Sequence, residues 1–290
     1  MTLAETPQPP LYLGMAMWAN NDWRGSLLPA HGDAGLADYA RVFNAVEGNT
    51  TFYSGLPKAE TIAAWAAQAP STFRFCFKLP GQLTHAKRLR EIDDEFARFV
   101  EGLGPLADRL GPLMVQLPRD FGHAELPALA QLLSRWPPGL PCAVEVRELE
   151  FFHKGLAEQS LNRLLISQDV DRVMLDVRAL FATPAGLDKK LAAAQGEKPK
   201  VPLHVLSTAV NPVVRFIGHF DEAINAARFA PWIERLGLWI KQGKTPFLFV
   251  HTPDNRQAPE LARQCYSRLA ERVALPPLAE FAGDRQESLF

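Results

Sequence analysis

Short apolar segments rich in β-branched and aromatic residues recur along the whole chain, and their regular spacing limits the fold more than any other feature. Segments with helical periodicity lie between them, including 58–68, 92–106, 126–136 and 258–273. Strands that alternate with helices form parallel sheets, because each parallel connection has to cross over the sheet. Eight such units in about 250 residues predict an α/β fold, a single TIM (β/α)8 barrel. The eight expected strands are 12–18, 42–52, 73–80, 113–118, 142–147, 172–177, 213–218 and 247–252.

The composition agrees with one large folded domain. Hydrophobic residues make up 47% of the 290 residues, which is enough to bury a core without disulfide bonds. We expect the barrel domain to span 11–275, with a loose leader at 1–10 and a tail at 276–290. A polar, lysine-rich stretch within about 179–212 predicts an excursion between the sixth and seventh strands, on the catalytic face of the barrel.

Charge and cysteine content narrow the class of protein further. The chain has 31 basic and 32 acidic side chains, so a strong non-specific attraction to nucleic acid or anionic lipid is not expected. Its three cysteines are far apart and favour a reducing compartment. The first residues lack a signal-peptide pattern, and no apolar run is long enough for a membrane helix. We therefore expect a cytoplasmic protein without a membrane partner; its oligomeric state is not indicated.

The alternation of side chains along each strand assigns charged residues to the barrel interior. In the fifth strand the valines suit the side facing the helices, which places Glu145 and Arg147 inside. The same argument for the sixth strand places Asp176 and Arg178 inside. The remaining strands add inward residues near their carboxyl ends, namely Trp18, Glu47, Asn49, Lys78, Gln116, Arg215 and His251. This is the face on which TIM barrels carry their active sites, although a purely structural network of neutralised charges is the alternative.

The residue types in this cluster suggest roles in catalysis and binding. Glu145 and Asp176 form the preferred acid/base pair, with His251 as a proton shuttle or a structural histidine and Glu47 as a further carboxylate. Lys78 and the inward arginines Arg147, Arg178 and Arg215 are expected to bind a phosphate or carboxylate. Aromatic faces and polar groups for substrate binding are expected from Trp18, Tyr53, Asn49, Gln116, Asp254 and Asn255.

The sequence predicts no cofactor. It contains no dinucleotide-binding, P-loop or nucleophile-elbow motif. A divalent metal held by carboxylates and His251 is a weaker alternative, because no HxH or HExxH spacing supports it and the nearby arginines already supply positive charge.

The segment 46–85 resembles the signature of the YecE-like family, catalogued as domain of unknown function 72. The family pattern VExNSTFY…P…W…P..F.F..K…..TH is matched by Val46, Glu47, Asn49, Thr51, Phe52, Tyr53, Pro57, Trp65, Pro70, Phe73, Phe75, Lys78, Thr84 and His85. Three further segments, LGMAMWANNDWRGSLLP, LGPLMVQLPRDF and AVEVR, agree in the same order, so the likeness covers roughly residues 11–275. The resemblance implies a TIM barrel without an established activity. It also adds His85 to the catalytic candidates.

The sequence departs from the commoner family pattern in three places. Residues 15–17 replace a small Thr-Ser-Gly-like run, and Gly48 precedes Asn49 inside the signature. The eighth strand ends in HTPDN rather than in an asparagine-rich FNN motif, so Asp254 and Asn255 are expected to belong to a subfamily with its own loops.

These features support three functional hypotheses. The first is an enzyme, a hydrolase, isomerase or lyase, that uses carboxylate acid/base chemistry on a small anionic or sugar-like substrate at the C-terminal face of the barrel. The second is a metal-dependent phosphodiesterase or nucleic-acid-binding protein. Its basic rim would comprise Lys87, Arg88, Arg90, Lys189, Lys190, Lys198 and Lys200. The third is a non-catalytic barrel that binds a metabolite.

Overall fold

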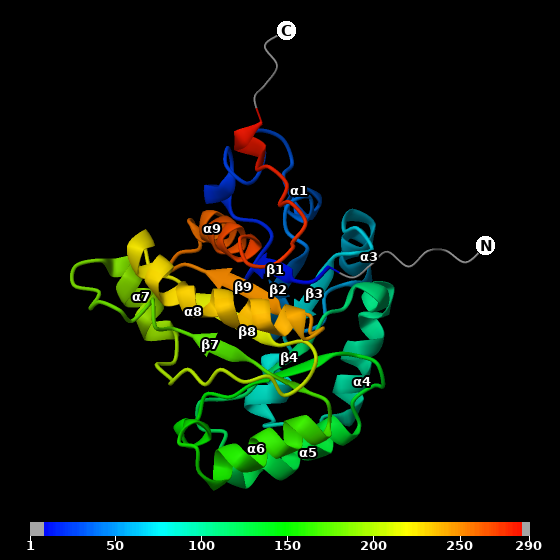
Figure 1. The fold of residues 1–290 in the computed structure, drawn as a ribbon. Helices are drawn as coiled ribbons and strands as arrows, with labels where there is room; N and C mark the ends of the chain where they lie inside the picture. Colours follow the sequence, from blue (N-terminus) through cyan, green and yellow to red (C-terminus); the bar gives the residue numbers. More distant parts are fainter. Residues whose placement is uncertain (1–8, 286–290) are drawn as a thin grey trace.

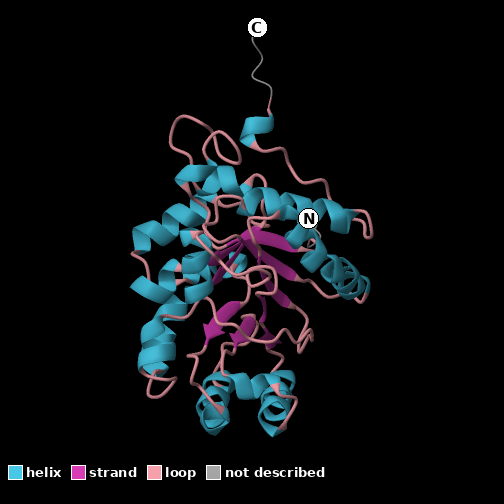
Figure 2. Ribbon diagram, turned by 90° about the vertical axis from the view of Figure 1, so that its left-hand side faces the viewer, coloured by secondary structure: helices cyan, strands magenta, loops and turns pink. Residues whose placement is uncertain are grey.

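The strands of the protein pair in parallel and form two sheets. The computed structural model describes residues 9–285. The larger sheet has six strands in the order β3-β2-β1-β9-β8-β7, and the smaller has three in the order β4-β5-β6. The strands lie in the interior and the helices surround them (Figures 1 and 2). Their bounds are β1 Tyr12–Met15, β2 Ala45–Gly48, β3 Arg74–Phe77, β4 Leu113–Gln116, β5 Cys142–Glu145, β6 Asp171–Arg172, β7 Met174–Asp176, β8 Val213–Ile217 and β9 Phe247–His251.

Helices occupy most of the connections between successive strands. The α-helices are α1 Leu36–Ala40, α2 Thr50–Ser54, α3 Ala59–Gln68, α4 Asp93–Gly102, α5 Leu126–Ser134, α6 Leu156–Ser167, α7 Lys189–Glu197, α8 Glu222–Lys241 and α9 Ala258–Ala270. Short 3-10 helices are η1 Asn21–Trp23, η3 Gly104–Arg109, η4 His123–Glu125, η5 Leu149–Phe152 and η6 Ala282–Asp284, and a π-helix, η2, spans Gln82–Ala86. The four helical segments expected from periodicity correspond to α3, α4 with η3, α5 and α9.

The predicted α/β class with parallel strands is confirmed, but the pairing does not show a closed eight-stranded barrel. The expected sixth strand is divided into β6, which pairs with β5, and β7, which pairs with β8. Thr208 explains part of the division, because its hydroxyl accepts the Arg172 N–H at 2.8 Å and donates to the Val170 carbonyl at 2.6 Å. A side chain thus takes the hydrogen bonds that a neighbouring strand would make.

The second strand was predicted to span 42–52, and this prediction is wrong beyond Gly48. β2 ends there, and the Thr-Thr-Phe-Tyr-Ser run forms α2 instead. The Thr51 hydroxyl donates to the Lys78 carbonyl at 2.7 Å, which fixes this turn of helix against the end of β3. A tertiary contact therefore overrides the β propensity of these residues.

Segment 179–212, predicted as an excursion, contains one helix, α7, which packs over β7 and β8. The Asp188 carboxylate caps α7 by accepting the backbone N–H groups of Lys190 and Leu191, each at 2.9 Å. Leu191 belongs to one apolar cluster with Leu175 on β7 and Ile217 on β8. α7 is thus anchored near the carboxyl ends of these two strands.

The chain ends were predicted as a leader at 1–10 and a tail at 276–290. Residues 1–8 and 286–290 lie outside the described part of the chain. The described part of the tail packs against the domain: Phe281 is buried beside Phe43, and the Gly283 N–H donates to the Ser26 carbonyl at 2.8 Å. Within 9–285, no helix is both long and apolar enough to cross a membrane.

β1 and β2 approach each other closely at Gly14. A methyl group added at Gly14 would overlap the backbone carbonyl of Ala45, which cannot move without disturbing the sheet. We expect Gly14→Ala to lower the free energy of unfolding by about 1–3 kcal/mol or more. Urea unfolding measures this. Gly196→Ala in α7, which meets nothing within 4 Å, is the control and should not destabilise the protein; equal effects would contradict the packing argument.

Candidate functional site

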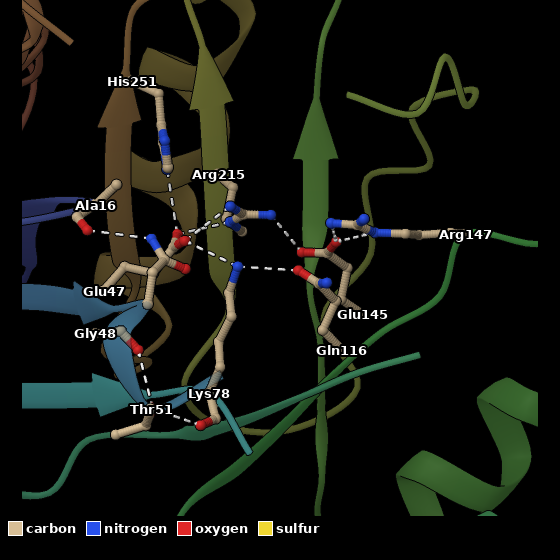
Figure 3. Close-up of polar contacts among 11 residues, drawn as sticks. Ala16, Glu47, Gly48, Thr51, Lys78, Gln116, Glu145, Arg147, Arg215 and His251 are labelled. Carbon is tan, nitrogen blue, oxygen red and sulfur yellow. Dashed lines mark hydrogen bonds and ion pairs between the residues drawn. The ribbon is translucent and has the colours of Figure 1, made fainter. Parts of the chain in front are cut away.

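A buried guanidinium group joins the two sheets. Arg215 on β8 donates to Glu47 on β2 through Nε at 2.6 Å and Nη2 at 2.8 Å. Its third nitrogen, Nη1, donates to Glu145 on β5 at 2.6 Å. Figure 3 shows Arg215 lying between the two carboxylates. All three side chains are at most 2% exposed, so an ion triad links the larger sheet to the smaller one.

Four further side chains extend the triad along the strand ends. The Lys78 amine lies between Gln116 Oε1, to which it donates at 2.9 Å, and Glu47 Oε1 at 3.2 Å (Figure 3). On the far side of Glu145, Arg147 donates from Nε to Oε1 at 2.7 Å. His251 Nε2 lies 3.2 Å from Glu47 Oε2.

The arginines keep both carboxylates of the triad ionised. Burial by itself would raise the pKa of Glu145, but the charges of Arg215, Arg147 and Lys78 outweigh it and lower the pKa to about 2. Arg215, Lys78 and His251 likewise hold the pKa of Glu47 well below its usual range against the effect of burial. Neither carboxyl group therefore holds a proton near neutral pH.

Lys78 and His251 are shifted towards their neutral forms. Burial and the neighbouring Arg215 lower the pKa of Lys78 to about 8, with Glu47 and Glu145 opposing the shift. Burial lowers the pKa of His251 to about 4 against the pull of Glu47. The imidazole is therefore neutral at pH 7, and its Nε2–H donates to the Glu47 carboxylate. Among the groups of this network, the Lys78 amine has the pKa nearest to neutrality.

A cavity of about 560 Å3 opens onto this network. Lys78, Gln116, Arg147, Arg215 and His251 line it together with Asn49, Tyr53, Asn255, Ala16, Met17, Phe52, Glu197 and Lys198. The network itself contains three cations, Lys78, Arg147 and Arg215, and two carboxylates. The cavity wall therefore carries a surplus of positive charge, which suits an anionic ligand.

The predicted inward direction of Asp176 and Arg178 is wrong. Asp176 accepts from the indole Nε1 of Trp232 on α8 at 2.7 Å and pairs with Arg178 at 2.8 Å. In register, Asp176 is the partner of Phe216, and Leu175 is the partner of Arg215. Since Arg215 faces the cavity, Leu175 shares its side and Asp176 faces the helices. The valines predicted the wrong direction because the segment 172–177, which contains β7, has apolar neighbours on both of its faces.

Three aromatic candidates lie at different distances from the cavity. Trp18 packs edge-on against Trp65, with ring centroids 5.0 Å apart, and is not part of the cavity wall. Tyr53 is part of the wall and is 83% exposed. His85 lies one side chain away, edge-on to Phe52 at 5.0 Å. Burial and the Arg147 charge lower the pKa of His85.

Asp254 and Asn255, the polar residues predicted to bind substrate after β9, form hydrogen bonds and an ion pair within the protein. Asp254 pairs with Lys190 at 2.7 Å and so ties α7 to the end of β9. The Asn255 carbonyl accepts from Trp23 Nε1 at 2.8 Å, and its side-chain oxygen accepts from the Thr252 N–H at 3.3 Å. Asn49, which directly follows β2, donates to the Ala16 carbonyl at 3.1 Å. These residues shape the rim by holding loops in place.

Three of the seven basic residues expected at the rim are paired with carboxylates. Arg88 pairs with Glu125 at 2.5 Å and with Asp120 at 3.0 Å, Lys87 pairs with Glu95, and Lys190 with Asp254. Lys198 differs, because it is half-buried and lines the cavity. Sequence reasoning grouped it with the rim lysines, and the lysine-rich composition of the excursion was the signal that pointed to it.

The geometry offers no ready metal centre. In the part of the chain that the structure describes, no three His, Cys, Asp or Glu side chains converge as metal ligands do. The predicted metal ligands do not come together. Asp176 faces the helices, and Glu47 and Glu145 are already paired with arginines.

The fold and the cavity define an α/β protein of parallel strands with a charged pocket at the strand ends. A family model described as "Protein of unknown function DUF72" matches residues 12–283. The UPF0759 protein YecE is 43% identical in Escherichia coli strain K12 and 42% identical in E. coli O157:H7, each over 97% of this chain and 100% of the relative. The chain belongs to the DUF72 family, which confirms the resemblance seen in the sequence.

Solved structures of this family share the fold. A DUF72 family protein (EF0366) from Enterococcus faecalis V583 superposes with a TM-score of 0.67 at 17% identity, over 96% of this chain and 100% of that one. A DUF72 family protein (TM1631) from Thermotoga maritima MSB8 gives a TM-score of 0.64 at 20% identity, over 89% and 98%. At this identity the likeness concerns the fold alone.

Removing the central guanidinium is expected to destabilise the protein strongly. Arg215→Met deprives two buried carboxylates of their shared partner, which should cost about 3–5 kcal/mol of unfolding free energy in urea. Arg41→Met is the matched control, because Arg41 is 62% exposed and lies 3.7 Å from Asp38. A change below about 1 kcal/mol is expected there. Similar losses in both variants would contradict a central role for Arg215.

Acid is expected to remove the stabilisation that Glu145 provides. Its pKa is lowered from 4.5 to about 2 in the folded protein, so its contribution is complete above pH 4.5 and is lost as the pH falls from there towards 2. The unfolding free energies of wild type and Glu145→Gln, measured between about pH 6 and pH 3, should therefore converge as the pH falls. The exposed control Glu101→Gln should keep the wild-type slope. A difference between wild type and Glu145→Gln that does not change with pH would refute the assignment.

Proposed function

We propose that this protein is an enzyme that binds a small anionic or sugar-like substrate in the cavity at the carboxyl ends of its strands. The surplus of positive charge around that cavity is the observation that carries the proposal. Arg147 supports it directly: its Nε and Nη2 bind Glu145, which leaves Nη1 available to a ligand. A phosphate or carboxylate suits such a guanidinium, because its donors form a planar fork.

Proton transfer in this proposal belongs to Lys78 rather than to Glu145. A carboxylate with a pKa of about 2 is a weak base near neutral pH, whereas an amine with a pKa of about 8 exchanges protons readily. Glu47 and Glu145 then serve as fixed counter-charges that orient the cations. The reaction class stays as expected from the sequence, a hydrolysis, isomerisation or lysis, with electrostatic stabilisation by the cations.

We also infer that the two sheets are parts of one interrupted (β/α)8 barrel. β3 meets β4 through the isolated parallel bridges Phe75↔Leu110 and Lys78↔Met114, and β6 is separated from β7 by Val173 alone. One interior cluster draws a residue from every expected strand: Tyr12, Ala45, Cys76, Met114, Ala143, Val173, Val213, Phe247 and Phe249. A layer of side chains of this kind fills the centre of a barrel. The cavity then lies on the face where barrel enzymes bind their substrates.

A ligand screen tests the proposal. We expect phosphorylated sugars such as ribose 5-phosphate, but not ribose, to raise the unfolding temperature; a ligand at 100 times its dissociation constant stabilises by about 2.7 kcal/mol. Arg147→Met should abolish the shift while Glu145 keeps Arg215 as its partner. Arg98→Met, a change on the exposed face of α4, should preserve it.

Turnover separates an enzyme from a barrel that only binds a metabolite. Stabilising compounds are incubated with the protein and followed by NMR, and conversion that disappears in Lys78→Met supports catalysis. Binding without conversion across the panel would favour the non-catalytic hypothesis. A shift with oligonucleotides alone would overturn the small-anion proposal.

A further inference from the structure

We infer that Lys78 is a nucleophile that forms a covalent imine with an anionic carbonyl compound held in the cavity. The inference rests on the proposed function and deepens it, because it names a substrate class, ketones and aldehydes that carry a phosphate or carboxylate. An amine can act in this way only if it is held in place, reaches the cavity and can lose its proton.

The position of the amine meets the first two requirements. Lys78 directly follows β3, and its backbone forms a parallel bridge with Met114 in β4. Its Nζ is fixed by Gln116 Oε1 at 2.9 Å and Glu47 Oε1 at 3.2 Å. The side chain is 7% exposed, and the residue lines the cavity of about 560 Å3. The amine is therefore enclosed by protein and open on the side of the cavity.

Burial meets the third requirement, because it is the largest of the effects that lower the pKa of Lys78. Arg215, which lies in the same network, lowers this pKa further, while Glu47 and Glu145 oppose the shift. An ordinary lysine with a pKa of 10.5 has a much smaller neutral fraction at pH 7 than one with a pKa of about 8. The difference in neutral amine is roughly a hundredfold or more, since each pKa unit changes it tenfold.

The remaining wall residues fit the rest of such a substrate. Arg147 and Lys198 offer positive charge for a phosphate or carboxylate group. Gln116 accepts from Lys78 through its oxygen, so its amide NH2 is available to donate to the carbonyl oxygen or to the hydroxyl formed from it. The cavity thus combines a nucleophile, a hydrogen-bond donor and an anion-binding side.

The chemistry balances without an oxidant or reductant. The neutral amine attacks the carbonyl carbon, and a proton moves from nitrogen to oxygen to give a carbinolamine. The carbinolamine hydroxyl takes up a proton from solvent and leaves as water, which gives the protonated imine on Lys78. Hydrolysis reverses these steps, and the imine can withdraw electrons from the carbon next to it, as isomerisation and lysis require.

Reductive trapping in the unmodified protein tests the inference. The protein is incubated with dihydroxyacetone phosphate or pyruvate and sodium cyanoborohydride, which converts an imine to a stable secondary amine by hydride transfer. We expect one adduct per chain, located at Lys78 by peptide mass spectrometry, and suppressed by inorganic phosphate. The uncharged analogue dihydroxyacetone should label Lys78 at least about tenfold less, as expected if the anion-binding side chains supply about 1.4 kcal/mol.

Variants provide the controls. Lys78→Met should lose the adduct, whereas Lys244→Met, outside the cavity, should keep it. Labelling of Lys198 instead, or labelling of surface lysines without saturation, would overturn the inference. If sugar phosphates still stabilise the protein but no adduct forms at Lys78, the imine is refuted and the anion-binding function stands. If neither effect is seen, both fail.

Discussion

The structure depends on the guanidinium group of Arg215. Two carboxylates from different sheets meet it in the interior, Glu47 through two hydrogen bonds and Glu145 through one. Moving these charges out of water is costly, and only close, hydrogen-bonded pairing offsets the cost. Arginine suits this position because its fork of donors serves two acceptors at once, which a lysine ammonium cannot match in geometry. The same contacts join the strand ends and determine where the cavity lies.

The charges around the triad support our proposal of a binding site over a purely structural network. A network that served stability alone would be expected to balance its charges, because an unmatched buried ion costs several kcal/mol. Here two carboxylates face three cations, and the cavity wall adds one cation, Lys198, and one carboxylate, Glu197. The uncompensated charge lies beside a cavity. An anion that enters would supply the missing partner.

The sequence predicted the direction of side chains along a strand better than it predicted which strands pair. Alternating parity correctly placed Glu145 and Arg147 at one site, because Val144 in β5 and Val146 just after it pack together in the apolar core on the other side of the chain. It failed for Asp176, since the strand there changes neighbours at Val173 and both of its faces are apolar. A side chain distant in sequence, that of Thr208, contributes to this change by accepting the Arg172 N–H. Local periodicity carries no information about it.

The excursion between β7 and β8 brings Lys198 to the cavity, a contact that the sequence did not predict when it placed this residue in a basic rim. Lys198 reaches the cavity because Asp188 caps α7, Leu191 packs over the strand ends, and Lys190 is tied to Asp254. Each contact is individually modest, but together they fix where the segment lies. The strands thus place the ion triad, and in our proposal the excursion between β7 and β8 completes the wall that a ligand would contact. On this proposal, we expect a relative with the same strands and a different excursion to keep the triad and to bind a different anion.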